Sequence, residues 1–389
     1  MLVTGTLGSI HAFSIFVSPL EDALQAGRAD ISTIYSFALV TLTFAVLVGH
    51  RLYPRVASPL LAGGACAVAA GGLLLASTAS SLVGLYLGYS LVFGVANGVG
   101  YGFVLQLVGQ ALPERRGLAM GLVTAVYALG AMLFARVFAT LVKAGSSPAD
   151  GVADAMQTMA IVLVVTAAVV AALLVISGAR YRGEVDTREA ATATAEAPVE
   201  PGFAWMAQLW FGYGFGVAAG LMAIAHAVGI VQSAGGSGEA LVLGAMLIGL
   251  GNAIGGVVAG WMCDRYSIKA LLVALPALSA AALVGLNLGG HAGIAIGLMC
   301  VIGFAYGAII SVYPAAISRY VGGGAAAKTY GRVFTAWGVA GLLAPWLAGR
   351  LFDADGNYSI ALWIAAALAL LSCVIASRYA RPGDVTVSR

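Results

Sequence analysis

Residues 160–177 read AIVLVVTAAVVAALLVIS, a run of eighteen residues without a charged, histidine, asparagine or glutamine side chain. A helix rises about 1.5 Å per residue, so roughly twenty apolar residues cross the hydrocarbon core of a bilayer. The run therefore predicts a membrane-spanning helix. Comparable runs recur along all 389 residues, with short polar breaks between them.

The composition leaves little room for a water-soluble domain. The chain is 61% hydrophobic and 9% charged, whereas a soluble domain carries roughly 25% charged residues. Its 53 glycines suit helices that pack closely through small side chains in lipid. We predict an all-α integral membrane protein with twelve transmembrane helices, at 2–22, 31–50, 58–78, 82–111, 117–142, 157–178, 205–234, 240–262, 270–288, 292–317, 330–351 and 359–377.

The sequence has no pattern typical of a metal, nucleotide or disulfide site. The four cysteines lie singly in apolar runs, without a C-x-x-C pair, so we expect them to act as small packing residues. No nucleotide-binding motif is present, and we predict no enzymatic activity, no catalytic residue, no cofactor and no metal. The net charge of +3 gives no reason to expect nucleic acid as a partner.

Lysine and arginine residues predict how the chain is oriented. With a cytoplasmic amino terminus, fifteen of these residues fall in inner loops, and three, Arg28, Lys143 and Arg350, fall outside. Cytoplasmic loops of membrane proteins carry such an excess of positive charge. We therefore expect both termini in the cytoplasm and the protein in the cytoplasmic (inner) membrane.

One long polar segment divides the chain into halves. RYRGEVDTREAATATAEAPVEPG, residues 180–202, combines charged residues with Thr, Ala and Pro and is typical of a flexible linker. We predict an N-terminal six-helix bundle over 1–179, a cytoplasmic linker over 180–203 and a C-terminal six-helix bundle over 204–389.

The two halves share short sequence matches. GVANG (94–98) matches GFAYG (303–307), and TAVYALG (124–130) matches TAWGVAG (335–341). Both pairs are separated by nearly the same number of residues, which indicates a duplicated six-helix unit. Internal repeats around a site at the bilayer midplane are typical of secondary transporters.

Four longer segments resemble one transporter family. SIFVSPLEDALQAGRADISTIYSFAL (14–39) and PERRGLAMGLVTAVYALG (113–130) resemble the oxalate/formate antiporter and monocarboxylate porter branches of the major facilitator superfamily. YGRVFTAWGVAGLLAP (330–345) is similar to the first of these branches, and GWMCDRYSIK (260–269) resembles the superfamily's loop after the eighth helix. The resemblance implies two pseudo-symmetric six-helix bundles around a central site, alternating access by rocking, and small carboxylates as substrates.

The sequence departs from the family pattern in three places. The loop GHRLYPR (49–55) lacks the Asp-Arg pair, so the conformational latch that the resemblance implies is expected only at Asp264 and Arg265. The eighth helix has Asn252 near its middle where related carriers have an arginine, and the eleventh helix has no lysine at mid-depth. Oxalate itself is therefore not the expected cargo.

Polar side chains near the middle of the predicted spans mark a candidate substrate site. Polar groups are costly in lipid, so they are expected to face the interior of the bundle. There, amide and phenol groups can hydrogen-bond a substrate that has lost its water. Hydrogen bonds between helices are the alternative role for each Asn and Tyr. The imidazole of His11 either attracts an anion or carries a coupling proton, or bonds a neighbouring helix as a neutral ring. The predicted substrate-binding residues are His11, Asn97, Tyr101, Tyr127, Asn252 and Tyr306.

Two further groups within the spans can carry positive charge. His226 lies about 9 Å outward of the middle of the seventh helix. As imidazolium it would attract an anion or carry a coupling proton, and as neutral imidazole it would bond a neighbouring helix. Arg136 lies near the outer end of the fifth helix, where it either reaches the membrane interface or contacts an anion. We predict both as proton-coupling or anion-attracting residues.

The placement of acidic residues favours an anionic or neutral cargo. No Asp or Glu lies deep in a predicted span, whereas proton-driven carriers of cationic drugs rely on a buried carboxylate. We predict a monomeric secondary transporter in the lipid bilayer that moves a small organic anion, above all a carboxylate, by proton symport or anion exchange. Two alternatives stay open: a carrier of a larger neutral or amphipathic solute such as a drug or siderophore, and a membrane sensor that transports nothing.

Overall fold

The computed structural model describes residues 1–49, 51–111, 116–181, 202–321 and 323–379. Its N-terminal half contains α1 (Leu2–Leu7), the 3₁₀ segment η1 (Gly8–Ile15), α2 (Val17–Leu24), α3 (Arg28–Gly49), α4 (Ser58–Ser77), α5 (Leu82–Leu85), the π-helical segment η2 (Tyr86–Phe93), α6 (Gly94–Ala111), α7 (Arg116–Ala144) and α8 (Pro148–Ser177). Its C-terminal half contains α10 (Phe203–Ala225), α11 (Ala227–Ser233), α12 (Glu239–Arg265), α13 (Ile268–Asn287), α14 (Ala292–Val321), α15 (Gly323–Asp355) and α16 (Ser359–Ser377).

These helices make the predicted twelve spans. Ten helical segments of the described chain are long and apolar enough to cross a membrane, and the bent pair Leu2–Ile15 and Val17–Leu24 adds an eleventh. The twelfth is α15, which is 33 residues long and packs against α3 and α10. The all-α, twelve-helix fold is thereby confirmed. The division into bundles at 1–179 and 204–389 stays a prediction, and most of the linker lies outside the described residues.

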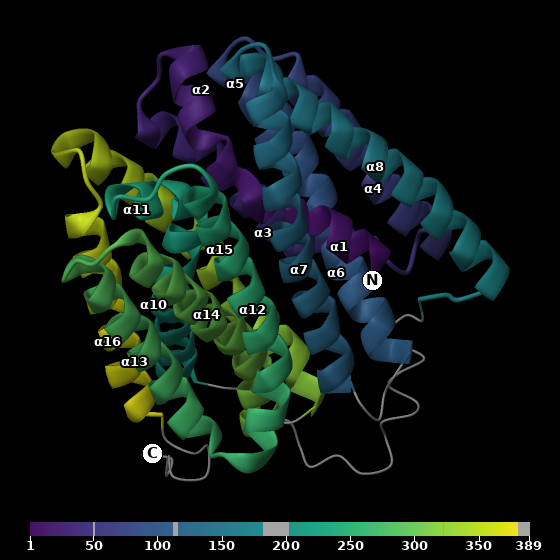
Figure 1. The fold of residues 1–389 in the computed structure, drawn as a ribbon. Helices are drawn as coiled ribbons and strands as arrows, with labels where there is room; N and C mark the ends of the chain where they lie inside the picture. The colour runs from purple at the N-terminus through teal and green to yellow at the C-terminus, as the bar shows by residue number, and fades with distance from the viewer. Residues whose placement is uncertain (50, 112–115, 182–201, 322, 380–389) are drawn as a thin grey trace.

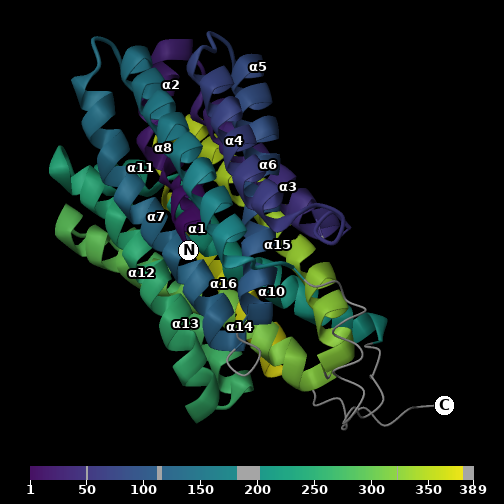
Figure 2. The same cartoon turned by 90° about the vertical axis from the view of Figure 1, so that its right-hand side faces the viewer.

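The two halves lie side by side (Figure 1). We call the end of the bundle where α8 ends and α10 begins the linker end. The far end is the opposite one, where α2 connects to α3, α11 to α12 and α15 to α16. The halves meet chiefly along two helix pairs, α3 with α15 and α7 with α12, and the turned view in Figure 2 shows the members of each pair running beside one another.

The first and seventh spans are broken rather than continuous, which the hydropathy of the sequence does not indicate. In the first span, α1 passes into η1 and the chain then bends by 58° before α2. A 3₁₀ segment bonds its own carbonyls less well than an α-helix does, and here Asn97 donates to the Leu7 carbonyl while Tyr89 donates to that of Ile10. In the seventh span, His226 itself separates α10 from α11.

Glycines let the helices touch backbone to backbone. On α12 and α14, an added methyl at Gly251, Gly255, Gly303 or Gly307 would overlap a carbonyl oxygen of the facing helix. Helices in lipid usually associate by close approach through small residues. The hydrophobic effect does not drive this association, because lipid tails are as apolar as the helix surfaces. Several of the glycines therefore lie where two helices cross and allow their backbones to touch.

Candidate functional site

His11 lies in η1, the central segment of the first span. Its Nδ1 lies 2.5 Å from the hydroxyl oxygen of Tyr35 on α3. Its ring meets those of Tyr35 and Tyr127 edge-on, with centroids 6.0 and 5.5 Å away. Among the described residues Nε2 has no hydrogen-bond partner, and 9% of the residue stays exposed. One nitrogen is thus held by the protein while the other can bond a ligand.

Asn97 and Tyr306 occupy matching positions in the two repeats, and each is bonded to the following helix of its own half. Tyr127 donates to Asn97 Oδ1 at 2.9 Å, and the Trp337 indole donates to the Tyr306 hydroxyl at 2.9 Å. Tyr127 lies on α7, and α7 contacts α14, the helix of the other half that carries Tyr306. The predicted residues Asn97, Tyr127 and Tyr306 therefore do lie near the interface between the repeats.

The remaining two predicted binding residues are placed less centrally in this network. Tyr101 is half-buried, with its ring centroid 4.9 Å from that of Tyr127 and its hydroxyl 3.4 Å from Thr124 Oγ1. Asn252 is buried, and its Oδ1 has no partner among the described residues. That oxygen is directed at Gly307 on α14. Asn252 thus contributes to the contact between α12 and α14 within one half.

Replacing Asn97 with alanine should destabilise the protein, because Asn97 holds η1 in place. Its amide is fully buried and joins the Leu7 carbonyl at 2.7 Å to the Tyr127 hydroxyl. Loss of both bonds leaves two buried polar groups unpaired, and we expect a decrease of about 1–3 kcal/mol in unfolding free energy. The thermal unfolding midpoint in detergent measures it. Tyr101→Phe, which removes one long bond, is the control, and equal midpoints for the two variants would contradict this role.

His226 is bonded on both sides by other helices. Its Nε2 lies 2.9 Å from the carbonyl oxygen of Pro345 on α15 and 3.4 Å from the hydroxyl of Ser32 on α3. Its Nδ1 lies 3.1 Å from the hydroxyl of Tyr358. This is the arrangement expected for a neutral imidazole between helices, near the far end. A role in proton coupling or anion attraction remains a prediction.

The other predicted charged residues lie at the ends of the bundle. Arg136 forms an ion pair with Glu239, at the start of α12, and both side chains are exposed, by 50% and 76%. The guanidinium of Arg265 lies over the ring of Trp261, 4.5 Å from its centroid. The side chain of Asp264 lies outside the described residues, so the latch at Asp264 and Arg265 also stays a prediction.

Two hollows, of about 370 and 340 Å³, lie at the far end of the described structure. The first is lined by Asn287, His291 and Tyr358, among others, and the second by Ser18, Asp22 and Ser146. None of the predicted site residues lines either hollow.

The family profile described as Major Facilitator Superfamily matches residues 1–345 and 204–388. The chain belongs to the major facilitator superfamily. It is therefore a membrane transporter and not an enzyme, as the sequence predicts. The segments that resemble this superfamily and the internal repeats both predict a transporter.

Two curated relatives within the superfamily match nearly the whole chain. The oxalate:formate antiporter of Oxalobacter formigenes is 23% identical over 95% of this chain and 87% of its own length. Monocarboxylate transporter 13 of Rattus norvegicus is 24% identical over 98% of this chain and 89% of its own. Among solved structures, the inward-open xylose transporter XylE from E. coli superposes with a TM-score of 0.72 at 13% identity, over 97% of this chain and 94% of that one, and so shares the fold.

Two residues of this superfamily member stand out in the structure although sequence reasoning missed them. Tyr35 bonds the central His11, and Arg28 lies at the centre of a buried network at the far end. Both fall within the segment 14–39 that resembles the carboxylate-transporting branches. The position of both polar residues in this segment, inside a predicted span or at its edge, was the available signal.

Proposed function

We propose that this carrier moves a small carboxylate across the membrane by alternating access, and that His11 pairs with the carboxylate. The observation that supports this most is the bonding of His11: Tyr35 holds Nδ1 at 2.5 Å, whereas Nε2 has no partner among the described residues. A ring fixed at one nitrogen can direct the other at a ligand.

The charges of the spans support an anionic cargo. A cation would find no counter-ion deep in the membrane, because no Asp or Glu lies there. An imidazole takes up a proton near neutral pH, and its N–H⁺ then makes a charge-assisted hydrogen bond to a carboxylate. The names of the oxalate:formate antiporter and monocarboxylate transporter 13 agree with this chemical class.

The same ring can account for coupling. If the proton and the carboxylate bind His11 at one side of the membrane, they cross together without net charge when the halves rock. When the carboxylate leaves on the other side, the His11 imidazolium loses its counter-ion and releases its proton to the same side. Exchange of one carboxylate for another would use the same pair without release of the proton.

We also propose the topology that the charge distribution predicts. The linker end faces the cytoplasm, both termini are cytoplasmic, and the protein works as a monomer in the inner membrane. The excess of Lys and Arg in the loops at that end supports this orientation, and the repeats support one site per chain.

Uptake into proteoliposomes tests the proposal. We expect the wild-type protein to accumulate labelled lactate or formate, and uptake to increase several-fold when the outside is made more acidic than the lumen. A vesicle preloaded with unlabelled carboxylate and without a pH gradient separates exchange from symport. Protein-free vesicles are the control. Absence of uptake for every mono- and dicarboxylate, under both conditions, would contradict the proposal.

A second candidate, a neutral or amphipathic cargo, rests on the aromatic side chains around the site. Tyr101 and Tyr127 contact each other in the N-terminal half, and Phe334 stacks on Trp337 in the other with centroids 5.4 Å apart. Aromatic surfaces bind apolar rings well. A higher thermal unfolding midpoint with a bulky neutral compound, without any response to carboxylates, would favour this candidate. The remaining alternative, a sensor without transport activity, would be excluded by uptake of any solute.

A further inference from the structure

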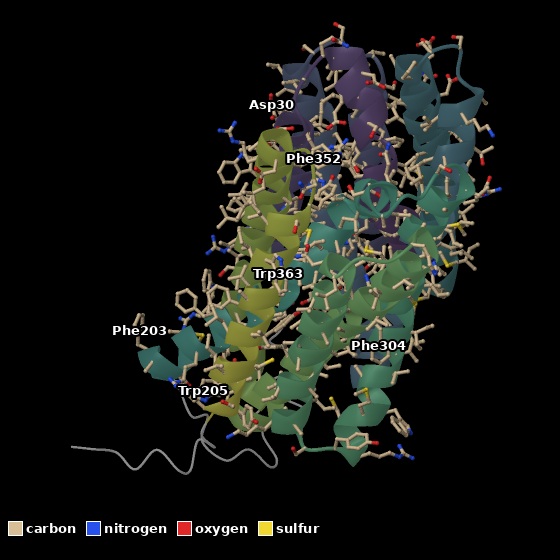
Figure 3. The ribbon with its side chains drawn as sticks, turned by 60° about the vertical axis from the view of Figure 1, so that its left-hand side comes forward. Asp30, Phe203, Trp205, Phe304, Phe352 and Trp363 are labelled. Carbon is tan, nitrogen blue, oxygen red and sulfur yellow. The ribbon has the colours of Figure 1, made fainter. Side chains whose placement is uncertain are left out.

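We propose that Arg28 holds the far end of the carrier closed, by joining the N-terminal half to α15 and α16 through one buried chain of hydrogen bonds. The proposal concerns the alternation between the two ends and does not depend on the identity of the cargo. Figure 3 shows that Phe352, whose ring Arg28 contacts, and Asp30, two residues after Arg28, lie at one end of the bundle, away from Phe203 and Trp205 at the linker end.

The guanidinium of Arg28 is fixed on its own side and presented to the other half. It makes a bidentate ion pair with Glu21 on α2, with N–O distances of 2.6 and 2.7 Å. Its Nη1 donates to the hydroxyl of Tyr358 at 3.0 Å, and its Cζ lies 3.9 Å from the ring centroid of Phe352. The residue is 8% exposed. Only a planar guanidinium can pair with a carboxylate, stack on a ring and donate to a phenol at once.

Asp353 makes a second connection between the halves at the same point. Its carboxylate accepts hydrogen bonds from the backbone N–H groups of Arg28 and Ala29, each at 2.9 Å. These are the first residues of α3, where unpaired N–H groups and the positive end of the helix dipole favour an anion. The acceptor belongs to α15, so the cap of α3 is complete only while the two halves are in contact.

The hydrogen bonds continue from Arg28 through Tyr358 to His226, and each group donates to the next. Tyr358 accepts from Arg28, so its own proton is available to Nδ1 of His226. Burial raises the pKa of Tyr358 to about 12, although Arg28 acts in the opposite sense, and the phenol keeps that proton. The carbonyl of Pro345 can only accept, so Nε2 of His226 must donate. His226 is then neutral, and both of its nitrogens serve the contact between halves.

An exposed ion pair at the same end provides a matched comparison. Arg136 and Glu239 also join the two halves, from α7 to α12, but their side chains are 50% and 76% exposed. Exposed pairs contribute little, whereas removing one partner of a buried pair leaves an uncompensated charge. Closure of the far end should therefore depend on Arg28 and hardly on Arg136.

Cysteine labelling in intact cells tests the proposal. The reporter is Ser32→Cys, since Ser32 is 1% exposed beneath the network and lies beside His226. The four native cysteines are replaced by alanine, and a membrane-impermeant maleimide is applied from outside. Arg28→Gln should raise the labelling rate at least about tenfold, Tyr358→Phe about threefold, and Arg136→Gln should leave it unchanged.

Two further cysteines make the result decisive. Ser146→Cys, in the exposed connection between α7 and α8, should react in every variant and establishes that the far end faces outside. Ser372→Cys, fully buried on α16, should stay unreactive. An unchanged rate at Ser32→Cys in a well-folded Arg28→Gln protein would overturn the proposal, as would a parallel rise at Ser372→Cys. If Arg28→Gln does not fold, Asp353→Asn must increase the rate at Ser32→Cys, and failure to do so overturns it equally.

Discussion

His11→Ala should decrease kcat/KM for carboxylate uptake in proteoliposomes by at least about a hundredfold. The reason is that the buried carboxylate of the cargo loses its charged partner. The variant leaves the rest of the site in place: Asn97 still bonds Leu7 and Tyr127. It removes the imidazole that, under our proposal, pairs with the cargo. The initial uptake rate as a function of substrate concentration, at several external pH values, measures the effect.

His11→Gln distinguishes charge from hydrogen bonding at the same position. The amide can accept from or donate to Tyr35 as the imidazole does, but it cannot gain a proton near neutral pH. If charge is needed, His11→Gln should fail as completely as His11→Ala. Tyr35→Phe removes only the 2.5 Å contact to Nδ1, and should shift the pH dependence of uptake while preserving it. Wild-type uptake with an unaltered pH profile in His11→Gln would show that the imidazole carries no charge.

Much of this fold follows from the sequence, because hydropathy and small residues act locally. The twelve spans could be predicted. Asn97 and Tyr306, which the sequence matches place at equivalent positions, bond Tyr127 and Trp337 on the following helix of each half. The breaks at η1 and at His226 could not be predicted. They involve partners from distant helices: Asn97 donates to the Leu7 carbonyl at the first break, and the Pro345 carbonyl bonds the ring of His226 at the second.

The residues that sequence reasoning misjudged share one property. Arg28, counted as an outer-loop charge, is buried because Asp353, Phe352 and Tyr358 meet it from more than three hundred positions away in the chain. The span position of Asn252 likewise does not indicate that its side chain lies against Gly307 on α14, and its role in substrate binding stays a prediction. Depth can be obtained from residue counts at 1.5 Å each, whereas the direction of a side chain in a helix with small residues all round requires the neighbouring helices.

Gly130→Val should prevent folding altogether, because the position of His11 depends on a crossing that admits no side chain. At Gly130 on α7 an added methyl would overlap the backbone oxygen of Gly5, and at Gly8 it would overlap that of Tyr127. These reciprocal contacts press α1 and η1 against α7. Overpacking a core side chain costs about 1–3 kcal/mol. Here the overlap is with backbone, which cannot rotate away, so the whole first span must move.

Gly64→Val is the matched control, since nothing lies within 4 Å of a methyl added at Gly64 on α4. The two substitutions add the same side chain to a transmembrane helix of the same half. We expect Gly64→Val to elute as a single species with a midpoint close to that of the wild type, and Gly130→Val to aggregate or not to accumulate. A well-folded Gly130→Val protein would mean that α1 can separate from α7, in which case the first span, and His11 with it, would not be fixed by this crossing.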